Sequence, residues 1–499
     1  MPDFDLAIVG GGINGAGIAR DAAGRGLKVL LVEQNDLASG TSSASSKLIH
    51  GGLRYLEHGA FRLVREALSE REVLLRTAPH VVRPMRFVLP PSPGPRSPLK
   101  LRAGLFLYDH LGAHKLLPPT KTIDLTHHPA GAPLKRSYRY AFEYSDCAVD
   151  DARLVVLAAR DAADRGASVR PRTRLTLAER GADEWKLVLN NRGRRQAATA
   201  RVLVNAAGPW AQQVADIILR VPLPKPMRLV QGSHIVVRGR FAHDSGYFLQ
   251  TDDKRIVFAL PFGTDFTLIG TTDRPFVGDV NTPAPTPDEV AYLCRAVNVY
   301  FRDVVTTDEI LWRYAGIRSL LDDGHGKPED VTRDYALVLD RERKKAPLLT
   351  VYGGKITTFR RLAEEALARL SSVLPVKAPW TATAALPGGE FSFDKIDEVL
   401  AGLRERWPFV PETLARRLVH AYGLRTETIL GNAASMDDLG PVFTGDLTGA
   451  EVRYLMREEW AQTAEDVLWR RTKLGLTTSE IQATTLAAFM AQTPPPPSA

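Results

Sequence analysis

Three glycines near the N-terminus, Gly10, Gly12 and Gly15, are followed by the carboxylate of Glu33. Glycine at these positions permits a tight turn, lets the backbone approach a pyrophosphate and lets a helix lie close to a strand. A helix that begins near Asn14 would direct its first amides at a negative group. An acid about 20 residues after such a turn accepts hydrogen bonds from an adenosine ribose. The spacing predicts a dinucleotide site but does not distinguish NAD from FAD.

The surrounding pattern supplies the elements that such a site needs. Residues 5–9 are an apolar run typical of a buried strand, 14–25 predicts a helix, and 28–32 predicts the next strand. A lone glycine motif also occurs in turns that bind nothing. Here the strand, the helix and the acid occur together, which favours the cofactor site.

The segment after Glu33 is rich in hydroxyl groups, with six Ser or Thr residues between Ser39 and Ser46. A flexible linker would share this polarity, but it would not need the apolar pair Leu48 and Ile49 that follows. Hydroxyls and backbone donors near the pyrophosphate would hold the middle of an extended FAD. The residues that we expect to contact the cofactor here are Thr41, Ser42, Ser45, Ser46, Lys47 and Leu48.

A second strand, glycine turn and helix occur late in the chain. Residues 347–352 predict a strand and 359–370 a helix, with Gly354, Lys355 and Thr357 between them. The helix N-terminus and the lysine suit the negative charge that a flavin acquires on reduction.

Gly208 follows the aliphatic strand predicted at 201–205. Glycine there would let a cofactor pass over the sheet edge without a side-chain clash. The alternative is an ordinary turn between a strand and a helix.

The chain has 499 residues, which predicts two or three domains, and 44% hydrophobic and 24% charged residues indicate a globular protein. No run of 18 apolar residues exists, and a strand that starts at Asp5 leaves no room for a signal peptide, so we expect a cytoplasmic protein. Cys147 and Cys294 form no CxxC pair. We therefore expect neither a disulfide-reducing flavoenzyme nor a metal site.

The net charge is +8, but residues 390–499 carry 11 Lys/Arg against 16 Asp/Glu, a balance of −5 that leaves +13 on residues 1–389. Phosphorylated small molecules, anionic lipid or nucleic acid could use such a field. No nucleic-acid motif accompanies the charge, so we expect no nucleic-acid partner.

Residues 81–120 are strongly basic, and 99–117 predicts a helix with an apolar face. A basic amphipathic helix is typical of a protein that lies on an anionic membrane surface. A core helix covered by its own protein explains the sequence equally well. Six Lys/Arg stand against Asp109 alone in this segment: Arg83, Arg86, Arg96, Lys100, Arg102 and Lys115.

Strand patterns dominate 221–322 and predict an antiparallel sheet that covers the flavin. A hairpin is predicted from 185–190 and 201–205, and 63–75 predicts a solvated helix. After residue 387 the chain is acidic and helix-rich, with no catalytic pattern.

The motifs taken together resemble the FAD-dependent, respiratory glycerol-3-phosphate dehydrogenases, and the likeness covers nearly the whole chain. The segments that carry it are Ile8–Ile18, Thr41–Leu56, Phe142–Cys147, Asp150–Leu154, Gly232–Ile235, Gly270–Asp273, Ala315–Arg318, Gly353–Thr358 and Leu468–Lys473.

The resemblance implies an α/β fold. An FAD-binding Rossmann-like domain of the glutathione-reductase or D-amino-acid-oxidase type would be interleaved with an antiparallel substrate domain and followed by an all-helical domain. The expected segments are 1–80, 150–220 and 323–386 for FAD, 81–149 and 221–322 for the substrate, 387–490 for the helices and 491–499 for a tail.

The resemblance also implies that sn-glycerol 3-phosphate is oxidised to dihydroxyacetone phosphate by hydride transfer from C2 to FAD N5. Arg54 and Tyr55 would bind the phosphate, since arginine binds it in a forked geometry. Arg318 and Lys355 would hold the C2 oxygen or the flavin edge and so bind the substrate. His234 or His50 is the candidate base, because imidazole titrates near neutrality, although either histidine could equally be a core residue.

Electrons would pass to ubiquinone or menaquinone from an enzyme peripheral on the inner face of the cell membrane, with a homodimer as a candidate assembly. One alternative is a glycerol-3-phosphate, amine or amino-acid oxidase that uses O2. Another is a flavin-dependent scaffold, which would not need Arg54, Arg318 and Lys355 together.

Overall fold

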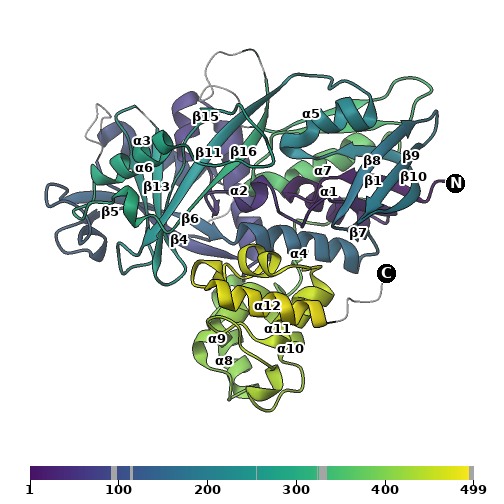
Figure 1. Cartoon of the computed structure of the whole chain (residues 1–499). Coiled ribbons are helices and arrows are strands. Elements are labelled where there is room, and N and C mark those ends of the chain that lie inside the picture. Colours follow the sequence, from purple (N-terminus) through teal and green to yellow (C-terminus); the bar gives the residue numbers. More distant parts are fainter. Residues whose placement is uncertain (92–97, 113–115, 254, 323, 325–333, 494–499) are drawn as a thin grey trace.

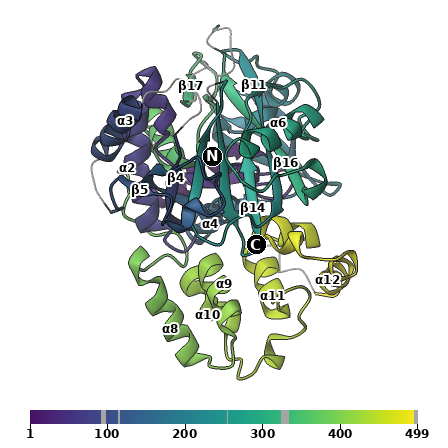
Figure 2. The same ribbon diagram turned by 90° about the vertical axis from the view of Figure 1, so that its left-hand side faces the viewer.

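The computed structural model shows two β-sheets side by side, with the C-terminal helices grouped against one side of them (Figure 1, Figure 2). The predicted α/β class with a C-terminal helical domain is confirmed. Arg96, Lys115 and the end of the predicted tail lie outside the described residues. The structure describes residues 1–499 except 92–97, 113–115, 254, 323, 325–333 and 494–499.

The first sheet has a parallel centre. β1 (Phe4–Val9) pairs in parallel with β2 (Val29–Val32) and with β10 (Arg194–Asn205), and β10 pairs in parallel with β18 (Leu348–Tyr352). Because parallel strands end at one edge of a sheet, the turns that follow these four strands lie together. The remaining strands are β7 (Ser168–Arg170), β8 (Thr173–Arg180), β9 (Trp185–Asn191) and β17 (Ala336–Asp340).

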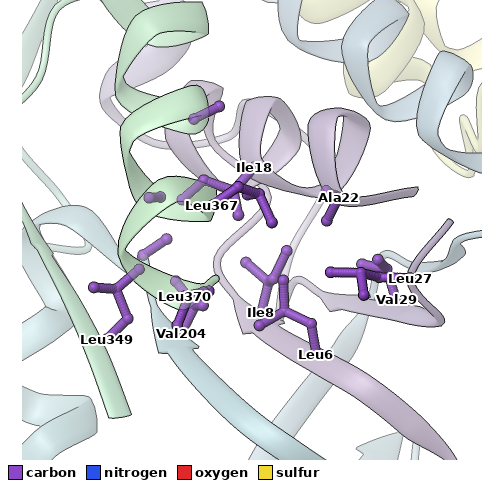
Figure 3. Close-up of a cluster of buried hydrophobic side chains, with 14 of the residues drawn as sticks. Leu6, Ile8, Ile18, Ala22, Leu27, Val29, Val204, Leu349, Leu367 and Leu370 are labelled. Carbon is purple, nitrogen blue, oxygen red and sulfur yellow. The ribbon is translucent and has the colours of Figure 1, made fainter. Parts of the chain in front are cut away.

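Aliphatic side chains from this sheet and from two helices form one core (Figure 3). α1 (Ile13–Gly24) and α7 (Phe359–Leu370) pack against each other. Ile18 and Leu367 from these helices join Ile8 of β1 in the cluster, and all three are fully buried. Complete burial of such a side chain stabilises the fold by roughly 1.5–3 kcal/mol. The core therefore fixes the first helix relative to the strand that precedes it.

α4 (Asp151–Asp164) packs against α1 and lies between the first sheet and the C-terminal helices (Figure 1). The side chain of Asp150 caps it by accepting a hydrogen bond from the backbone N–H of Arg153 at 3.2 Å. This helix therefore contacts the C-terminal part of the chain.

The second sheet is antiparallel within the described chain except for β4 and β12, which pair in parallel. The expected antiparallel sheet is therefore mixed. Its strands are β3 (Leu48–Ile49), β4 (Val82–Leu89), β5 (Lys121–Asp124), β6 (Tyr140–Val149), β11 (Met227–Arg238), β12 (Gly246–Gln250), β13 (Ile256–Phe262), β14 (Phe266–Gly270), β15 (Arg274–Pro275) and β16 (Trp312–Leu321).

Three helices accompany the second sheet. α6 (Pro287–Asn298) packs on β11 and begins with a capping box between Thr286 and Glu289. α3 (Pro98–Leu111) ends before the predicted residue 117. α2 (Phe61–Thr77) is not the predicted solvated helix, because α3 and the turn before α7 cover much of it.

The C-terminal helices enclose a core of their own, which includes Leu418 and Leu455. They are α8 (Ile396–Arg406), α9 (Glu412–Tyr422), α10 (Thr426–Leu430), α11 (Gly449–Glu458) and α12 (Glu480–Gln492). A π-helical turn, η11 (Asp466–Arg471), contacts α4.

The predicted hairpin has the wrong second strand, because residues 185–191 pair antiparallel with 194–200, while 202–205 pair with β1. The domain segments stay a prediction. Their first segment, 1–80, contributes to both sheets, since β3 pairs with β6.

Candidate active site

A cavity of about 360 Å³ lies along the edge where the parallel strands end and extends between the two sheets. Such an edge is where α/β proteins bind nucleotides. The predicted site residues that line the cavity are Gly10, Gly12, Asn14, Glu33, Thr41, Ser42, Ser45, Ser46, Leu48, His50, Arg54, Tyr55, Gly208, Arg318, Gly354, Lys355 and Thr357.

The glycine turn is shaped by close contacts. Gly10 has a φ of +112°, and a Cβ there would lie 2.5 Å from the carbonyl oxygen of Ala206. A Cβ on Gly15 would lie 1.9 Å from the carbonyl oxygen of Gly10, so only glycine lets α1 sit this close to β1. Gly12 is the N-cap residue of α1. The amide end of the helix therefore faces the cavity, where a pyrophosphate would be bound.

Glu33 follows β2, as predicted for a ribose-binding acid. Its Oε2 accepts a hydrogen bond from the N–H of Gly11 at 2.7 Å, and its Oε1 accepts one from the N–H of Asn35 at 2.8 Å. Both oxygens are thus held in place and keep a further lone pair for a ligand hydroxyl.

The hydroxyl-rich segment contacts two elements beside the cavity. The Ser42 hydroxyl accepts a hydrogen bond from the N–H of Ile13 at 3.0 Å, at the start of α1. The Thr41 hydroxyl donates to the carbonyl oxygen of Ile317 on β16 at 2.6 Å. The hydroxyl-rich segment is therefore a fixed wall of the cavity, which a mere linker would not be.

Asn14 leaves one polar atom without a partner. Its Nδ2 donates to the carbonyl oxygen of Gly353 at 2.9 Å, while its Oδ1 is buried and accepts no hydrogen bond from the described residues. An unsatisfied buried acceptor is costly unless a ligand satisfies it. Together with the close glycine turn, this atom fits a bound dinucleotide such as FAD.

A cationic cluster lines the cavity between the sheets. The Lys355 ammonium lies 3.8 Å from the centroid of the Tyr55 ring. Arg318 donates from Nη1 to the carboxylate of Asp273 at 2.8 Å. The backbone carbonyl oxygen of the next residue, Ser319, accepts a hydrogen bond from the N–H of Gly353 at 2.7 Å. Residues from three distant parts of the chain are thereby brought together.

Arg54 lies beside Tyr55 in the same cluster and lines the cavity. Over the part of the chain that the structure describes, its guanidinium has no ion-pair partner. A guanidinium that the described residues leave without an ion pair is suited to an anionic ligand.

The two candidate histidines occupy different environments. His50 lines the cavity, and its ring lies 6.2 Å from that of Phe258. His234 does not line the cavity. It is buried, stacks on Tyr314 and shares a hydrogen bond of 2.9 Å with the Ser46 hydroxyl. Burial, with the nearby Arg318 charge, lowers the pKa of His234 to about 3, so its imidazole is neutral and weakly basic.

Lys47 also faces away from the cavity. Its ammonium donates to both carboxylate oxygens of Asp151, at 2.8 and 2.9 Å. The structure therefore gives Lys47 a different position from that expected of a cofactor ligand. Gly15, the third predicted residue that does not line the cavity, acts through helix packing.

The prediction missed several residues that line the cavity, among them Asp146, Tyr144, Phe258 and Trp210. Asp146 is buried, which raises its pKa, while its ion pair with Arg71 acts in the opposite direction. A sequence signal for Asp146 was available, because it belongs to one of the segments that carried the resemblance.

The described residues hold neither a metal-binding cluster nor a helix that could span a membrane. No group of three or more His, Cys, Asp or Glu side chains there is arranged to hold a metal ion. No helix in the described ranges combines the length and apolar character needed to cross a bilayer.

The fold and the cavity define the class of a dinucleotide-dependent flavoenzyme. A family model described as FAD dependent oxidoreductase matches residues 5–360, and one described as the C-terminal domain of alpha-glycerophosphate oxidase matches residues 379–493. The chain therefore belongs to the FAD-dependent oxidoreductase family, in the branch that contains the glycerol-3-phosphate dehydrogenases. FAD is its cofactor, and the resemblance inferred from the sequence is confirmed.

Individual relatives are similar over nearly their full length. D-erythritol 1-phosphate dehydrogenase of Brucella abortus is 50% identical, with 95% of this chain and 96% of the relative covered. Glycerol-3-phosphate dehydrogenase of Pseudomonas aeruginosa is also 50% identical, with 98% and 95% covered. The crystal structure of glycerol-3-phosphate dehydrogenase from Bacillus halodurans complexed with FAD has a TM-score of 0.75 at 24% identity and covers 98% of this chain and 94% of its own.

Proposed function

We propose that the protein oxidises the C2 alcohol of sn-glycerol 3-phosphate to the ketone of dihydroxyacetone phosphate. The observation that carries this proposal is the cluster of Arg54, Tyr55, Arg318 and Lys355 in one cavity with His50. A scaffold that only bound a flavin would not need these cations together. The names of the relatives support the same substrate class.

The four side chains of the cluster form two pairs with different roles. Arg54 and Tyr55 bind the phosphate through a guanidinium and a hydroxyl. Lys355 and Arg318 stabilise the negative charge that develops on the C2 oxygen as the alcohol becomes a ketone. Asp273, which also lines the cavity, accepts a hydrogen bond from the Arg318 guanidinium at 2.8 Å and so fixes its direction.

Proton removal falls to His50. Its ring lines the cavity, whereas His234 is excluded from the cavity and has a strongly lowered pKa. The proton leaves the C2 hydroxyl for the His50 imidazole as the C2 hydrogen leaves with its electron pair. FAD, when bound, supplies the hydride acceptor at N5.

The predicted cofactor contacts extend along the cavity from Glu33 to the glycine turn that contains Gly354. Glu33 would bind the ribose, and Gly10, Gly12 and Gly15 would shape the pyrophosphate turn. The other contacts proposed are Asn14, Thr41, Ser42, Ser45, Ser46, Leu48, Gly208, Gly354, Lys355 and Thr357, with Lys47 acting through the loop that it holds.

Anaerobic mixing tests the substrate directly. Purified protein carrying FAD is mixed with glycerol 3-phosphate while the flavin absorbance is followed, with glycerol and a D-amino acid as controls. We expect glycerol 3-phosphate to bleach the flavin and the controls to leave it yellow. Bleaching by the amino acid, or no bleaching by glycerol 3-phosphate, would contradict the proposal.

D-erythritol 1-phosphate is a second candidate substrate, because its dehydrogenase from Brucella abortus is as similar as the glycerol-3-phosphate enzyme. Both compounds join a terminal phosphate to secondary alcohols. The ratio of kcat/KM for the two substrates, measured with one soluble dye, decides between them. We expect glycerol 3-phosphate to have the higher value.

Re-oxidation by ubiquinone or menaquinone at the inner face of the cell membrane is the proposed second half-reaction. α3 supports it, because Leu99 is 76% exposed and Phe106 61% exposed, with Lys100 and Arg102 also exposed on the same helix. Apolar and basic side chains together suit an anionic bilayer. Quinone-dependent turnover without hydrogen peroxide would support this acceptor, and peroxide formation in air would favour the oxidase alternative.

The homodimer stays a prediction. Sedimentation of the FAD-loaded protein at several concentrations would test it, and a single species of monomer mass throughout would contradict it.

A further inference from the structure

The motif Leu468–Lys473 has no role in the proposed reaction, although it contributed to the resemblance. Most of it lies in η11, the turn of the C-terminal domain that contacts α4. Its side chains reach the hydroxyl-rich loop, here defined as residues 36–47, at both ends. The contacts at Asp36 are ionic, and those near Ser45 to Lys47 are both ionic and aromatic.

Asp36 is the contact at the beginning of the loop. Its carboxylate accepts hydrogen bonds from Arg471 at 2.7 and 2.9 Å and from Arg470 at 2.6 Å. All three side chains are buried. Charge-assisted pairs of this kind in a buried site fix the position of both partners.

Asp151 is the ionic contact at the end of the loop. Its side chain is fully buried and lies 3.6 Å from the Lys473 ammonium, while it also accepts hydrogen bonds from Lys47 and from the Ser45 hydroxyl, the latter at 2.8 Å. Burial alone would raise its pKa, but the ammonium groups of Lys47 and Lys473 lower it to about 2. The carboxylate therefore stays charged and bridges the C-terminal domain to the loop.

Both lysines on this carboxylate adopt left-handed backbone conformations, with a φ of +56° at Lys47 and +61° at Lys473. Non-glycine residues in this region persist only where surrounding contacts over-determine them. The shared carboxylate is such a contact. The loop conformation that places Ser45 and Ser46 on the cavity wall thus depends on the contacts of both lysines with Asp151.

An aromatic series reaches Ser45 and Ser46 of the same loop. Trp469 lies 4.6 Å from Trp312, and Trp312 lies 4.7 Å from Tyr314, as measured between ring centroids. The Tyr314 hydroxyl donates to the carbonyl oxygen of Ser45 at 2.8 Å. Tyr314 also stacks on His234, which shares a hydrogen bond with the Ser46 hydroxyl. This arrangement gives the buried His234 a structural role, because it supports the loop through Ser46 and does not line the cavity.

We propose that the C-terminal helical domain positions the 36–47 loop for FAD through Lys473 and Trp469. Both are positioning residues, because they act through Asp151 and Tyr314 and do not line the cavity. The proposal rests on the proposed contact between this loop and the cofactor.

Titration of the full-length apoprotein with FAD tests the proposal. Lys473→Met and Trp469→Leu should each raise the FAD dissociation constant by about fivefold or more, which corresponds to roughly 1 kcal/mol. Both should also alter the visible circular dichroism of the bound flavin. Lys473→Arg keeps the charge beside Asp151 and should restore both properties.

Arg425→Gln is the matched control. It removes an ion pair of 2.5 Å between α4 and the C-terminal domain, Arg425 with Asp164, that does not touch the loop. This variant should bind FAD as the parent does. An equal loss of FAD affinity in Arg425→Gln, or unchanged affinity and dichroism in both positioning variants, would overturn the proposal.

Ser46→Ala separates the two possible failures. If it weakens FAD binding while Lys473→Met and Trp469→Leu do not, the loop contacts FAD but the C-terminal domain does not position it. If Ser46→Ala, Lys473→Met and Trp469→Leu all leave FAD binding unchanged, the loop does not contact FAD as proposed, and the proposal fails with that contact.

Discussion

Gly15 is the residue at which the cofactor turn is most sensitive to a side chain. A Cβ there would lie 1.9 Å from the carbonyl oxygen of Gly10, so α1 must move away from β1 in Gly15→Ala. We expect the FAD dissociation constant to rise by about tenfold or more, or roughly 1.4 kcal/mol. Titration of the apoprotein with FAD measures it.

Gly402 provides the control for this substitution. It lies inside α8, and a Cβ there would meet nothing within 4 Å. Gly402→Ala should therefore stabilise the protein by about 0.5–1 kcal/mol and leave FAD binding unchanged. Equal FAD affinity in the two alanine variants would show that the close approach at Gly15 is not needed.

Arg54 is the residue that we expect to determine affinity for the phosphate. Hydrogen bonds to charged groups contribute about 1.5–3 kcal/mol, so Arg54→Met should raise KM for glycerol 3-phosphate by about tenfold to a hundredfold. Arg54→Lys keeps the charge without the fork and should be intermediate. Steady-state kinetics with a soluble dye gives these values.

Arg62→Met is the comparison for Arg54. The Arg62 side chain is 78% exposed, and its ion pair with Asp334 lies on the surface. Its removal should leave KM unchanged. A KM for Arg54→Met within twofold of the parent would remove Arg54 from the phosphate site.

At the scale of the element, α3 is the helix whose exposed face is unusual. We expect Lys100→Glu with Arg102→Glu to weaken binding to anionic vesicles by at least about thirtyfold, since each basic residue near such a surface contributes about 1 kcal/mol. Activity with a soluble dye should be intact. Vesicle sedimentation in low salt measures the binding.

The same reversal on another surface helix controls for net charge. Arg404→Glu with Arg406→Glu changes two exposed arginines of α8 and should affect vesicle binding less. If the α3 variant still binds vesicles as the parent does in low salt, α3 is not the membrane-binding surface.

At the scale of the whole molecule, the buried His80 and the partly buried His420 lie near the junction between the C-terminal helices and the rest. His80 is fully buried, and its ring nitrogens make no hydrogen bond to the described residues. Burial, with the Arg153 charge, lowers its pKa to about 3, and burial with Arg83 lowers that of His420 to about 4. Both imidazoles are therefore neutral in the folded protein.

This neutrality makes stability depend on pH. In the unfolded chain these histidines are protonated below about pH 6.5. In the folded protein they are protonated only below about pH 3 to 4. Their contribution is fully present above pH 6.5 and is lost as the pH falls, by about 2 kcal/mol each at pH 5. His80→Leu should reduce the difference in unfolding free energy between pH 7.5 and pH 5.

Urea unfolding at the two pH values checks this prediction. The control is His127→Leu, because the His127 side chain is 86% exposed. His127→Leu should keep the pH dependence of the parent. If His80→Leu also keeps it, buried His80 does not contribute to acid sensitivity.

Local sequence determined the elements that line one end of the cavity and that we propose bind FAD, because their signals are short-range. The glycine turn, the helix after it and the acid of Glu33 all lie within about 30 residues, the span of one βαβ unit. The prediction of α7 at 359–370 agrees with the structure to the residue, since its apolar period is strong. The same motifs were enough to identify the family.

Tertiary structure alone decided which side chains face the cavity. Lys47 and Ser46 are neighbours in a polar segment, yet Lys47 faces Asp151 while Ser46 lines the cavity. His50 and His234 carry the same chemistry, but only the fold buries His234 against Tyr314. Such directions depend on partners about 100 to 190 residues away, whose positions no local pattern contains. The sequence therefore identified the chemistry, and long-range packing selected the residues that can perform it.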